Sequence, residues 1–462
     1  MSGRGFGTSV RRLVPLAWPV MVGQLAVLAF STIDTVLVGR AGATDLAALA
    51  IGSSAYITVF IGLMGIVLAV GPIAGQLFGA RHHAQAGAQL HQAIWLALAL
   101  SVPGCLLLLY PQPFLALAHA EPVVAHKVRG YLGALALALP GALVFTAYRG
   151  FNTAVSRPKA VMALQLGALA LKLPLSAWLV FGGLGLPALG APGAGLATAA
   201  CMALQCAAAA VLLRRDPFYA PFALGTRLQP PHRASLAALL RLGLPMGGSV
   251  MVEVTGFSFM AIFIARLGTV PVAGHQIALN LVAAMFMVPL GIANAAGTLV
   301  AQDIGAGDLR GARRVGWHGL EFGVLVAAAM GGAMWLLREP VLSFYTRDAA
   351  IVAAALPLLA WVALFHVADA AQTVAAFVLR AWRVTLAPML IYVTAIWGVG
   401  LAGGYVLAFD VPGGVPARLL GAPGYWSAAT AGLVLAGLLL SALLLVLLRR
   451  QRSREASPAM PG

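Results

Sequence analysis

The stretch "PVMVGQLAVLAFSTIDTVLVGRAG", residues 19–42, decides how the chain folds. Asp34 and Arg40 are its only charged residues, and the run is longer than the about 20 apolar residues that a helix needs to cross a bilayer. A basic residue and a glycine then end the run. Apolar runs separated by short polar breaks follow along nearly the whole chain, so we expect a polytopic, all-helical membrane protein.

The composition of the 462 residues agrees with this interpretation. Hydrophobic residues make up 61% and charged residues 9% of the chain, whereas soluble domains carry about a quarter charged residues. The net charge of +16 does not indicate nucleic-acid binding, because the basic residues form short clusters between apolar runs. The expected partner is therefore the lipid bilayer, with no nucleic acid. Cys105, Cys201 and Cys206 lie in apolar segments and indicate neither disulfides nor a zinc site.

Twelve membrane-spanning helices can be placed between the polar breaks. Their predicted limits are 13–38, 46–77, 88–110, 123–149, 160–182, 194–213, 236–265, 272–302, 317–337, 350–379, 386–408 and 425–448. The first run is too long for a signal peptide, so we expect it to be retained as a span. Of the 29 lysines and arginines, 21 fall on the side that holds both termini, which predicts that this side is cytoplasmic.

The chain repeats itself when it is shifted by 226 residues. The matches fall at turns and breaks: Pro19 on Pro245, Arg40 on Arg266, Gly42 on Gly268, Gly65 on Gly291, Gly79 on Gly305 and Arg157 on Arg383. The motif "GAPG" also recurs, at 190–193 and 421–424. Six spans in each half make the repeat a parallel one. We therefore predict two pseudo-symmetric six-helix lobes, at 1–213 and 236–448, joined by a cytoplasmic linker at 214–235 and followed by a cytoplasmic tail at 449–462.

Four charged residues lie inside the predicted spans: Asp34, Lys172, Glu253 and Asp369. An ionised side chain at the bilayer centre costs about 2.5 kcal/mol or more, so such residues usually face protein or water and mark a path for ions or substrates. Glu253 is the deepest acid, about 18 Å from each end of its helix. Lys172 also lies near mid-span, and Asp34 is its expected partner; an ion pair of Asp34 with Arg40 is the alternative.

The segment "HVADAAQTV", residues 366–374, places a polar stripe on an apolar helix. His366, Asp369 and Gln372 follow one another at intervals of three, so they share one helix face. No zinc motif surrounds His366, which we interpret as a hydrogen-bonded bundle residue. The repeat does not copy the acids, since Glu253 falls on Val27. This difference predicts one ion-coupling site in the second lobe and a separate polar site in the first.

Three segments, at 19–54, 242–280 and 366–382, resemble the multidrug and toxic compound extrusion (MATE) family in its NorM-like bacterial branch. The resemblance implies two six-helix bundles and an antiporter of the bacterial inner membrane, not an enzyme. Such a protein exports cationic, amphipathic drugs in exchange for Na⁺ or H⁺. No cofactor is expected beyond the coupling ion, and we expect a monomer.

The resemblance also implies roles for individual residues. The expected cation-coupling acids are Glu253, Asp369 and Asp34, with Glu253 and Asp369 as ligands if the ion is Na⁺. The expected substrate-binding or supporting residues are Gln276, Asn280, His366, Gln372, Lys172 and Gln24. One segment departs from the family, because "KLPLS", residues 172–176, stands where the branch usually has Asn-Ile-Pro-Leu-Asn. A lysine here could neutralise Asp34 and exclude a cation from the first lobe.

Other functions fit the sequence less well. A lipid-linked oligosaccharide flippase would share this general fold, but it is expected to need several basic residues for pyrophosphate, and only Lys172 is available. An intramembrane aspartyl protease needs two aspartates that share a proton, and neither Asp34 nor Asp369 lies in a Tyr-Asp or Gly-x-Gly-Asp context. A receptor or channel gives no reason for the repeat.

Overall fold

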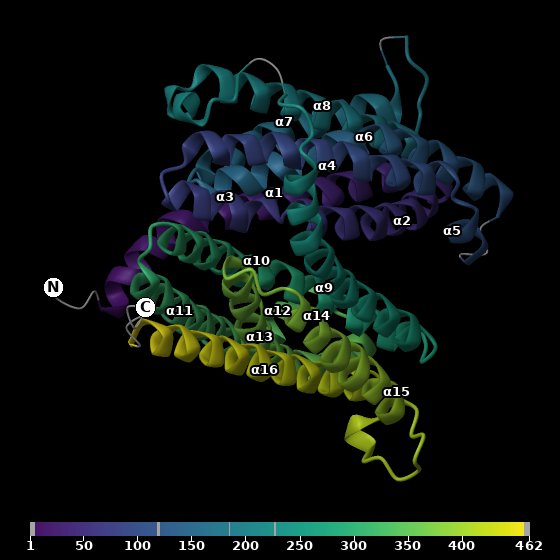
Figure 1. Ribbon diagram of the computed structural model, residues 1–462. Helices are drawn as coiled ribbons and strands as arrows, with labels where there is room; N and C mark the ends of the chain where they lie inside the picture. Colours follow the sequence, from purple (N-terminus) through teal and green to yellow (C-terminus); the bar gives the residue numbers. More distant parts are fainter. Residues whose placement is uncertain (1–4, 118–120, 184, 226–227, 457–462) are drawn as a thin grey trace. The chain divides into compact units, whose positions relative to one another are not determined.

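The computed structural model describes residues 5–117, 121–183, 185–225 and 228–456. Within these ranges the chain consists of helices and turns, with one isolated β-bridge between Gly183 and Leu186. In each half of the chain the long helices run side by side as a bundle (Figure 1). The structure therefore confirms the predicted all-helical class.

The first half of the chain forms six spans. Its helices are α1 (Phe6–Ala41), α2 (Ala43–Val67), α3 (Val70–Gly79), α4 (His83–Leu109), α5 (Gln112–Leu117), α6 (Pro122–Ala154), α7 (Pro158–Phe181) and α8 (Ala191–Arg215), followed by the short helix η1 (Pro217–Phe222). Helices α2 and α3 make up a single span, Ala43–Gly79, and α5 is too short to cross a membrane.

The second half also forms six spans. Its helices are α9 (Arg233–Ala265), α10 (Thr269–Gly305), α11 (Leu309–Leu336), α12 (Arg338–Tyr345), α13 (Ala349–Ala381), α14 (Leu386–Tyr392), η2 (Val393–Ala402), α15 (Gly403–Ala408), η3 (Ala417–Leu419) and α16 (Ala422–Ala456). A π-helix, η2, joins α14 to α15 within one span, Leu386–Ala408. The twelve spans confirm the twelve predicted runs. Most helices extend a few residues further, because polar residues at their ends remain helical after the apolar run stops.

One helix lies at the centre of each bundle. In the first half α6 packs against α2, α4 and α8, and in the second half α13 packs against α10, α11 and α16. Both central helices bury many alanines, which are small enough to let neighbouring backbones come close. The two sets of contacts match in order, as the sequence repeat predicts.

The turns between helices repeat in backbone detail. Arg81 and Gly307, which are 226 residues apart, both adopt positive φ, at 60° and 77°. The preceding amides, of Ala80 and Ala306, bond to the carbonyls of Gln76 and Gln302 at 3.0 and 2.9 Å. A positive φ strains any residue with a Cβ, so the arginine copy is the more strained of the two.

Two further turns also match between the halves. Gly190 and Gly421, the first residues of the two "GAPG" motifs, have φ of 61° and 70°. Ser156 and Arg383 also match, with φ of 61° and 59°. The residue equivalent to Arg383 is therefore Ser156 and not Arg157, so the structural repeat shifts by one residue beyond this point of the first half. A match of side-chain identity misled the sequence alignment, because the turn depends on backbone conformation.

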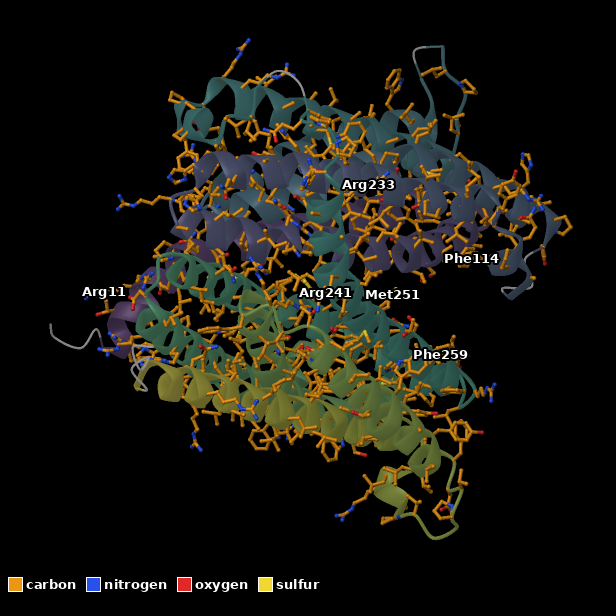
Figure 2. All side chains as sticks on the ribbon, in the orientation of Figure 1. Arg11, Phe114, Arg233, Arg241, Met251 and Phe259 are labelled. Atoms are coloured by element: carbon orange, nitrogen blue, oxygen red, sulfur yellow. The ribbon has the colours of Figure 1, made fainter. Side chains whose placement is uncertain are left out.

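The chain divides into two compact units at the middle of α1 and of α9. The first unit is Val22–Gly248 and the second unit is Met1–Met21 with Ser249–Gly462. Arg241 lies in the first unit and Met251 in the second, on the same helix (Figure 2). The predicted lobes divided instead at 213 and 236. The start of α1 and the start of α9 thus each pack with the other half of the sequence.

Repeated glycines explain why α1 and α9 divide there. A Cβ on Gly65 of α2 would lie 2.6 Å from Cα of Gly247 in the first half of α9. A Cβ on Gly291 of α10 would lie 2.7 Å from the carbonyl oxygen of Ala17 in the first part of α1. Each contact lies within one unit. Only glycine allows these backbones to approach so closely, which gives the Gly65 and Gly291 match a physical basis.

The predicted linker packs on helices of the first unit. Trp95 of α4 donates a hydrogen bond to the carbonyl oxygen of Gln229 at 2.8 Å, and the Gln92 amide binds Pro230 and His232. Arg157 forms an ion pair with Asp216, the residue before η1. These contacts fix the two ends of the segment onto α4 and α6.

Candidate functional site

The two acids of the second unit meet through one amide. Glu253 lies on the second half of α9, and Asp369 and Gln372 lie one helical turn apart on α13. The Gln372 Nε2 amide donates to Oδ1 of Asp369 at 2.8 Å and to Oε1 of Glu253 at 3.3 Å. Asp369 is 4% exposed and Gln372 is fully buried. The structure thus brings together Glu253, Asp369 and Gln372, three residues that the sequence predicted from separate segments.

The oxygens around this amide would suit a hard cation. The same Gln372 Nε2 lies 3.2 Å from the hydroxyl of Thr373, while Gln372 Oε1 is buried and has no hydrogen-bond partner among the described residues. Hard cations such as Na⁺ take carboxylate, amide and hydroxyl oxygens as ligands. Within the described residues, no group of three or more His, Cys, Asp or Glu could hold a metal ion. Neutral oxygens would therefore have to complete any cation site here.

A third charged group acts on the acids. Arg380, in the last turn of α13, and Tyr392 of α14 both interact electrostatically with Glu253. The Arg380 guanidinium stacks over the Phe377 ring at 4.6 Å, and no ion pair joins it to Glu253 in the described part of the chain. Two carboxylates face one guanidinium, so the ionised cluster keeps one net negative charge. A single monovalent cation would neutralise it.

The backbone beside Glu253 has an additional hydrogen-bond donor. The Trp397 indole of η2 donates to the carbonyl oxygen of Val252 at 3.0 Å, and the Thr255 hydroxyl approaches the same oxygen at 3.3 Å. In a π-helix the backbone bonds span five residues, and such segments often mark functional sites. Trp397 therefore holds the turn of α9 that carries Glu253. Sequence reasoning missed this residue, because an indole in an apolar run gives no charge or motif signal.

The π-helix also approaches α9 closely at Gly256. A Cβ on Gly256 would lie 2.7 Å from a methyl group of Ile396. Next to this contact is a cavity of about 20 Å³, lined by apolar residues of α9, η2 and α16 that include Phe257, Met260 and Leu433. A space of this size has room for about one water, but its lining offers no hydrogen-bond partners. We therefore interpret it as a packing gap beside the π-helix.

The polar site of the first unit is an ion pair. The Lys172 ammonium on α7 lies 2.8 Å from Oδ1 of Asp34 on α1, and the Ser176 hydroxyl donates to the same oxygen at 3.3 Å. Lys172 is fully buried and Asp34 is 7% exposed. The predicted pairing of Lys172 with Asp34 is thus confirmed, and the alternative pairing with Arg40 is wrong. Six residues of α1 separate Asp34 from Arg40, whereas the middle of α7 lies beside Asp34.

The remaining predicted residues lie in different surroundings. Gln24 accepts a hydrogen bond from Arg149 at 3.0 Å, within the first unit. Gln276 and Asn280, four residues apart on α10, are both exposed. His366 is fully buried, and neither ring nitrogen has a hydrogen-bond partner among the described residues. The interpretation of His366 as a hydrogen-bonded residue is therefore wrong: apolar neighbours surround the imidazole, and a sequence pattern does not show them.

Comparisons with known proteins identify the family of the chain. The MatE family model matches residues 19–178 and again 245–406, two stretches that begin 226 residues apart. The chain is 41% identical over 448 residues to the probable multidrug resistance protein NorM of Aromatoleum aromaticum, with 96% of each chain covered. It is 34% identical over 436 residues to the multidrug resistance protein PmpM of Pseudomonas aeruginosa, covering 93% of this chain and 90% of that protein.

A solved structure supports the fold. The Vibrio cholerae MATE transporter VcmN, in its bent form, matches with a TM-score of 0.83 at 18% identity, covering 96% of this chain and 98% of that one. The chain therefore belongs to the MatE family, the multidrug and toxic compound extrusion family that the sequence resembles, and is similar throughout to proteins named NorM.

Proposed function

We propose that this chain is a multidrug antiporter that exports cationic, amphipathic drugs in exchange for Na⁺ or H⁺. Membership of the MatE family and similarity to proteins named multidrug resistance protein support the transport of drugs. The observation that carries the coupling is the pair of buried acids, Glu253 and Asp369, joined by the Gln372 amide. Buried acids of this kind in a membrane protein usually serve an ion or proton path. The role is transport and not catalysis.

The net charge of the acid cluster suggests how two fluxes are coupled. When Glu253 and Asp369 are ionised, they outnumber the single guanidinium of Arg380 and attract a cation. Binding of Na⁺ or H⁺ neutralises the cluster and removes the charge that a cationic drug would need. If the ion and the drug each exclude the other, inward flow of the ion drives outward flow of the drug. A ligand shifts a conformational equilibrium only by its difference in affinity for the two states, and this charge supplies such a difference.

The location of the protein belongs to the same proposal. Twelve spans and bacterial relatives support a bacterial inner membrane, and the excess of lysines and arginines on one side supports cytoplasmic termini. We propose a monomer, since each bundle already encloses its own buried acid or ion pair. Reporter fusions to the C-terminus would test the orientation: an active periplasmic phosphatase at this end would contradict it.

Ethidium transport in proteoliposomes tests the function directly. The purified protein would be given an Na⁺ gradient alone and then a pH gradient alone, with ionophores that collapse each gradient as controls. We expect at least one gradient to drive ethidium against its concentration difference, and the effective gradient identifies the coupling ion. Ethidium movement that ignores both gradients would contradict coupled antiport, and no ethidium movement at all would contradict drug transport.

A further inference from the structure

The Lys172 side chain ends in a complete cage of oxygens within the first unit. Its ammonium lies 2.6 Å from the Thr198 hydroxyl, 2.8 Å from Oδ1 of Asp34 and 3.0 Å from the carbonyl oxygen of Ala194. A protonated lysine has three N–H donors, and here they meet three acceptors. The cage is supplied by α1 and α8, so it exists only in the folded unit.

The cage is built for the charged form of the lysine. The Thr198 hydroxyl uses its own hydrogen to bond Ala194 at 3.0 Å, so towards Lys172 it can only accept. A neutral amine would direct a lone pair at one of three oxygens and leave that oxygen unpaired. Lys172 is fully buried, whereas the Asp34 side chain keeps 10% of its surface exposed. A solute that reaches this site therefore meets a carboxylate that already has its counter-ion.

The same three oxygens are the ligands that a hard cation would take. Carboxylate, hydroxyl and backbone carbonyl oxygens at one point form a donor set suited to Na⁺. In the second unit the comparable acids, Glu253 and Asp369, are joined by a neutral amide and form no ion pair within the described residues. One unit thus holds its cation covalently, and the other has a carboxylate cluster that a mobile cation could neutralise.

We propose that the Lys172 ammonium is a tethered cation that fills the cation position at Asp34, so that the first unit binds neither Na⁺ nor a cationic drug there. The chain then couples drug export to one monovalent cation per cycle, taken up by Glu253 and Asp369. This inference rests on the proposed function and revises the role of Asp34, which becomes a positioning residue for Lys172. Lys172 is in turn the residue that determines how many cations the transporter exchanges.

The first experiment removes the pair as a unit. In the double variant Asp34→Asn with Lys172→Met, both charges are lost and side-chain volume is nearly kept, a change that folded proteins often tolerate. We expect ion-driven ethidium efflux with the same ion dependence as the unmodified protein. If the unmodified protein transports and the folded double variant does not, the inference is overturned. If the unmodified protein itself shows no ion-driven efflux, the proposed function fails instead.

The second experiment needs no transport and uses Na⁺ itself as the probe. Glu253→Gln with Asp369→Asn first removes the acids of the second unit. In that background we expect Na⁺, compared with choline, to leave the melting temperature in detergent unchanged while Lys172 is present. Adding Lys172→Asn should empty the cage and make Na⁺ stabilising, because a ligand that binds only the folded state raises its stability. Stabilisation by Na⁺ with Lys172 in place, or none in the folded Lys172→Asn variant, would overturn the proposal.

Discussion

Asp34 in the first unit lies 2.8 Å from the ammonium of Lys172, whereas Glu253 and Asp369 in the second unit are joined only through the amide of Gln372. The first site is electrically neutral, and the second keeps an excess of negative charge. Helix order, turns and close helix contacts nevertheless repeat between the units. Duplication has thus kept the backbone architecture while the buried charges have diverged.

The divergence has a physical explanation. A glycine at a close helix contact or a residue at positive φ is required by backbone geometry, so both copies must keep a compatible residue. A buried charge is not required by the fold and is costly in lipid, so it persists where it has a partner or a function. The two units therefore share their contacts and differ in their chemistry.

The largest expected effect comes from Glu253→Gln, which gives the second site the neutral charge balance of the first. One carboxylate would then face one guanidinium, and no net charge would be left for a cation. We expect gradient-driven ethidium efflux in proteoliposomes to fall to the level of protein-free vesicles. The matched control is Glu339→Gln, the same chemical change at an exposed acid of α12, which should transport normally. Undiminished efflux by folded Glu253→Gln would show that this acid does not couple transport.

The next effect is on stability and makes the first site resemble the second. Lys172→Met leaves Asp34 buried without its counter-ion, and loss of one partner of a buried pair costs about 3–5 kcal/mol. We expect the free energy of unfolding in detergent to fall by that amount and to recover largely when Asp34→Asn is added. The control is Lys127→Met, since Lys127 pairs with Asp45 at 2.5 Å but its side chain is 33% exposed. Such exposed pairs contribute about 1 kcal/mol or less. Equal losses in both variants would mean that burial of the pair is irrelevant.

A smaller effect is expected at the amide that joins the two acids. Gln372→Leu removes hydrogen bonds to charged groups, each worth about 1.5–3 kcal/mol, which corresponds to about 10- to 100-fold in affinity. The concentration of coupling ion that gives half-maximal efflux should therefore rise by that factor. Ion titrations of ethidium efflux measure it, with the melting temperature as the check on folding. An unchanged ion dependence would exclude Gln372 from the cation site.

The smallest effect separates a positioning residue from an ordinary hydrogen bond. Trp397→Phe removes one indole donor, worth about 0.5–1.5 kcal/mol, from the backbone beside Glu253. Trp178→Phe removes an equivalent bond, because the Trp178 indole donates to the carbonyl oxygen of Gly183 at 3.0 Å in the first unit. We expect both variants to lose similar stability, but only Trp397→Phe to change the ion dependence of efflux. The same ion dependence in both would reduce Trp397 to a structural role.

Much of the fold could be predicted because lipid imposes a simple rule. Backbone groups in a bilayer must bond within their own segment, so each long apolar run becomes a helix. The twelve spans and the pairing of Asp34 with Lys172 followed from this rule and from the cost of a buried charge. The burial of His366 without partners did not follow, because helical spacing shows which residues share a face and not what lies opposite that face.

The sequence by itself determined that the chain is a duplicated bundle of membrane helices with four charges at depth, since hydropathy and repeated glycines are local properties of the chain. Only the tertiary structure decided which units the starts of α1 and α9 join, that one amide joins the acids of α9 and α13, and that the Lys172 ammonium has three acceptors. These features depend on atoms from helices far apart in the sequence, brought within about 3 Å of one another, the range of a hydrogen bond. Such distances are set by how helices pack and not by the order of residues along any one of them.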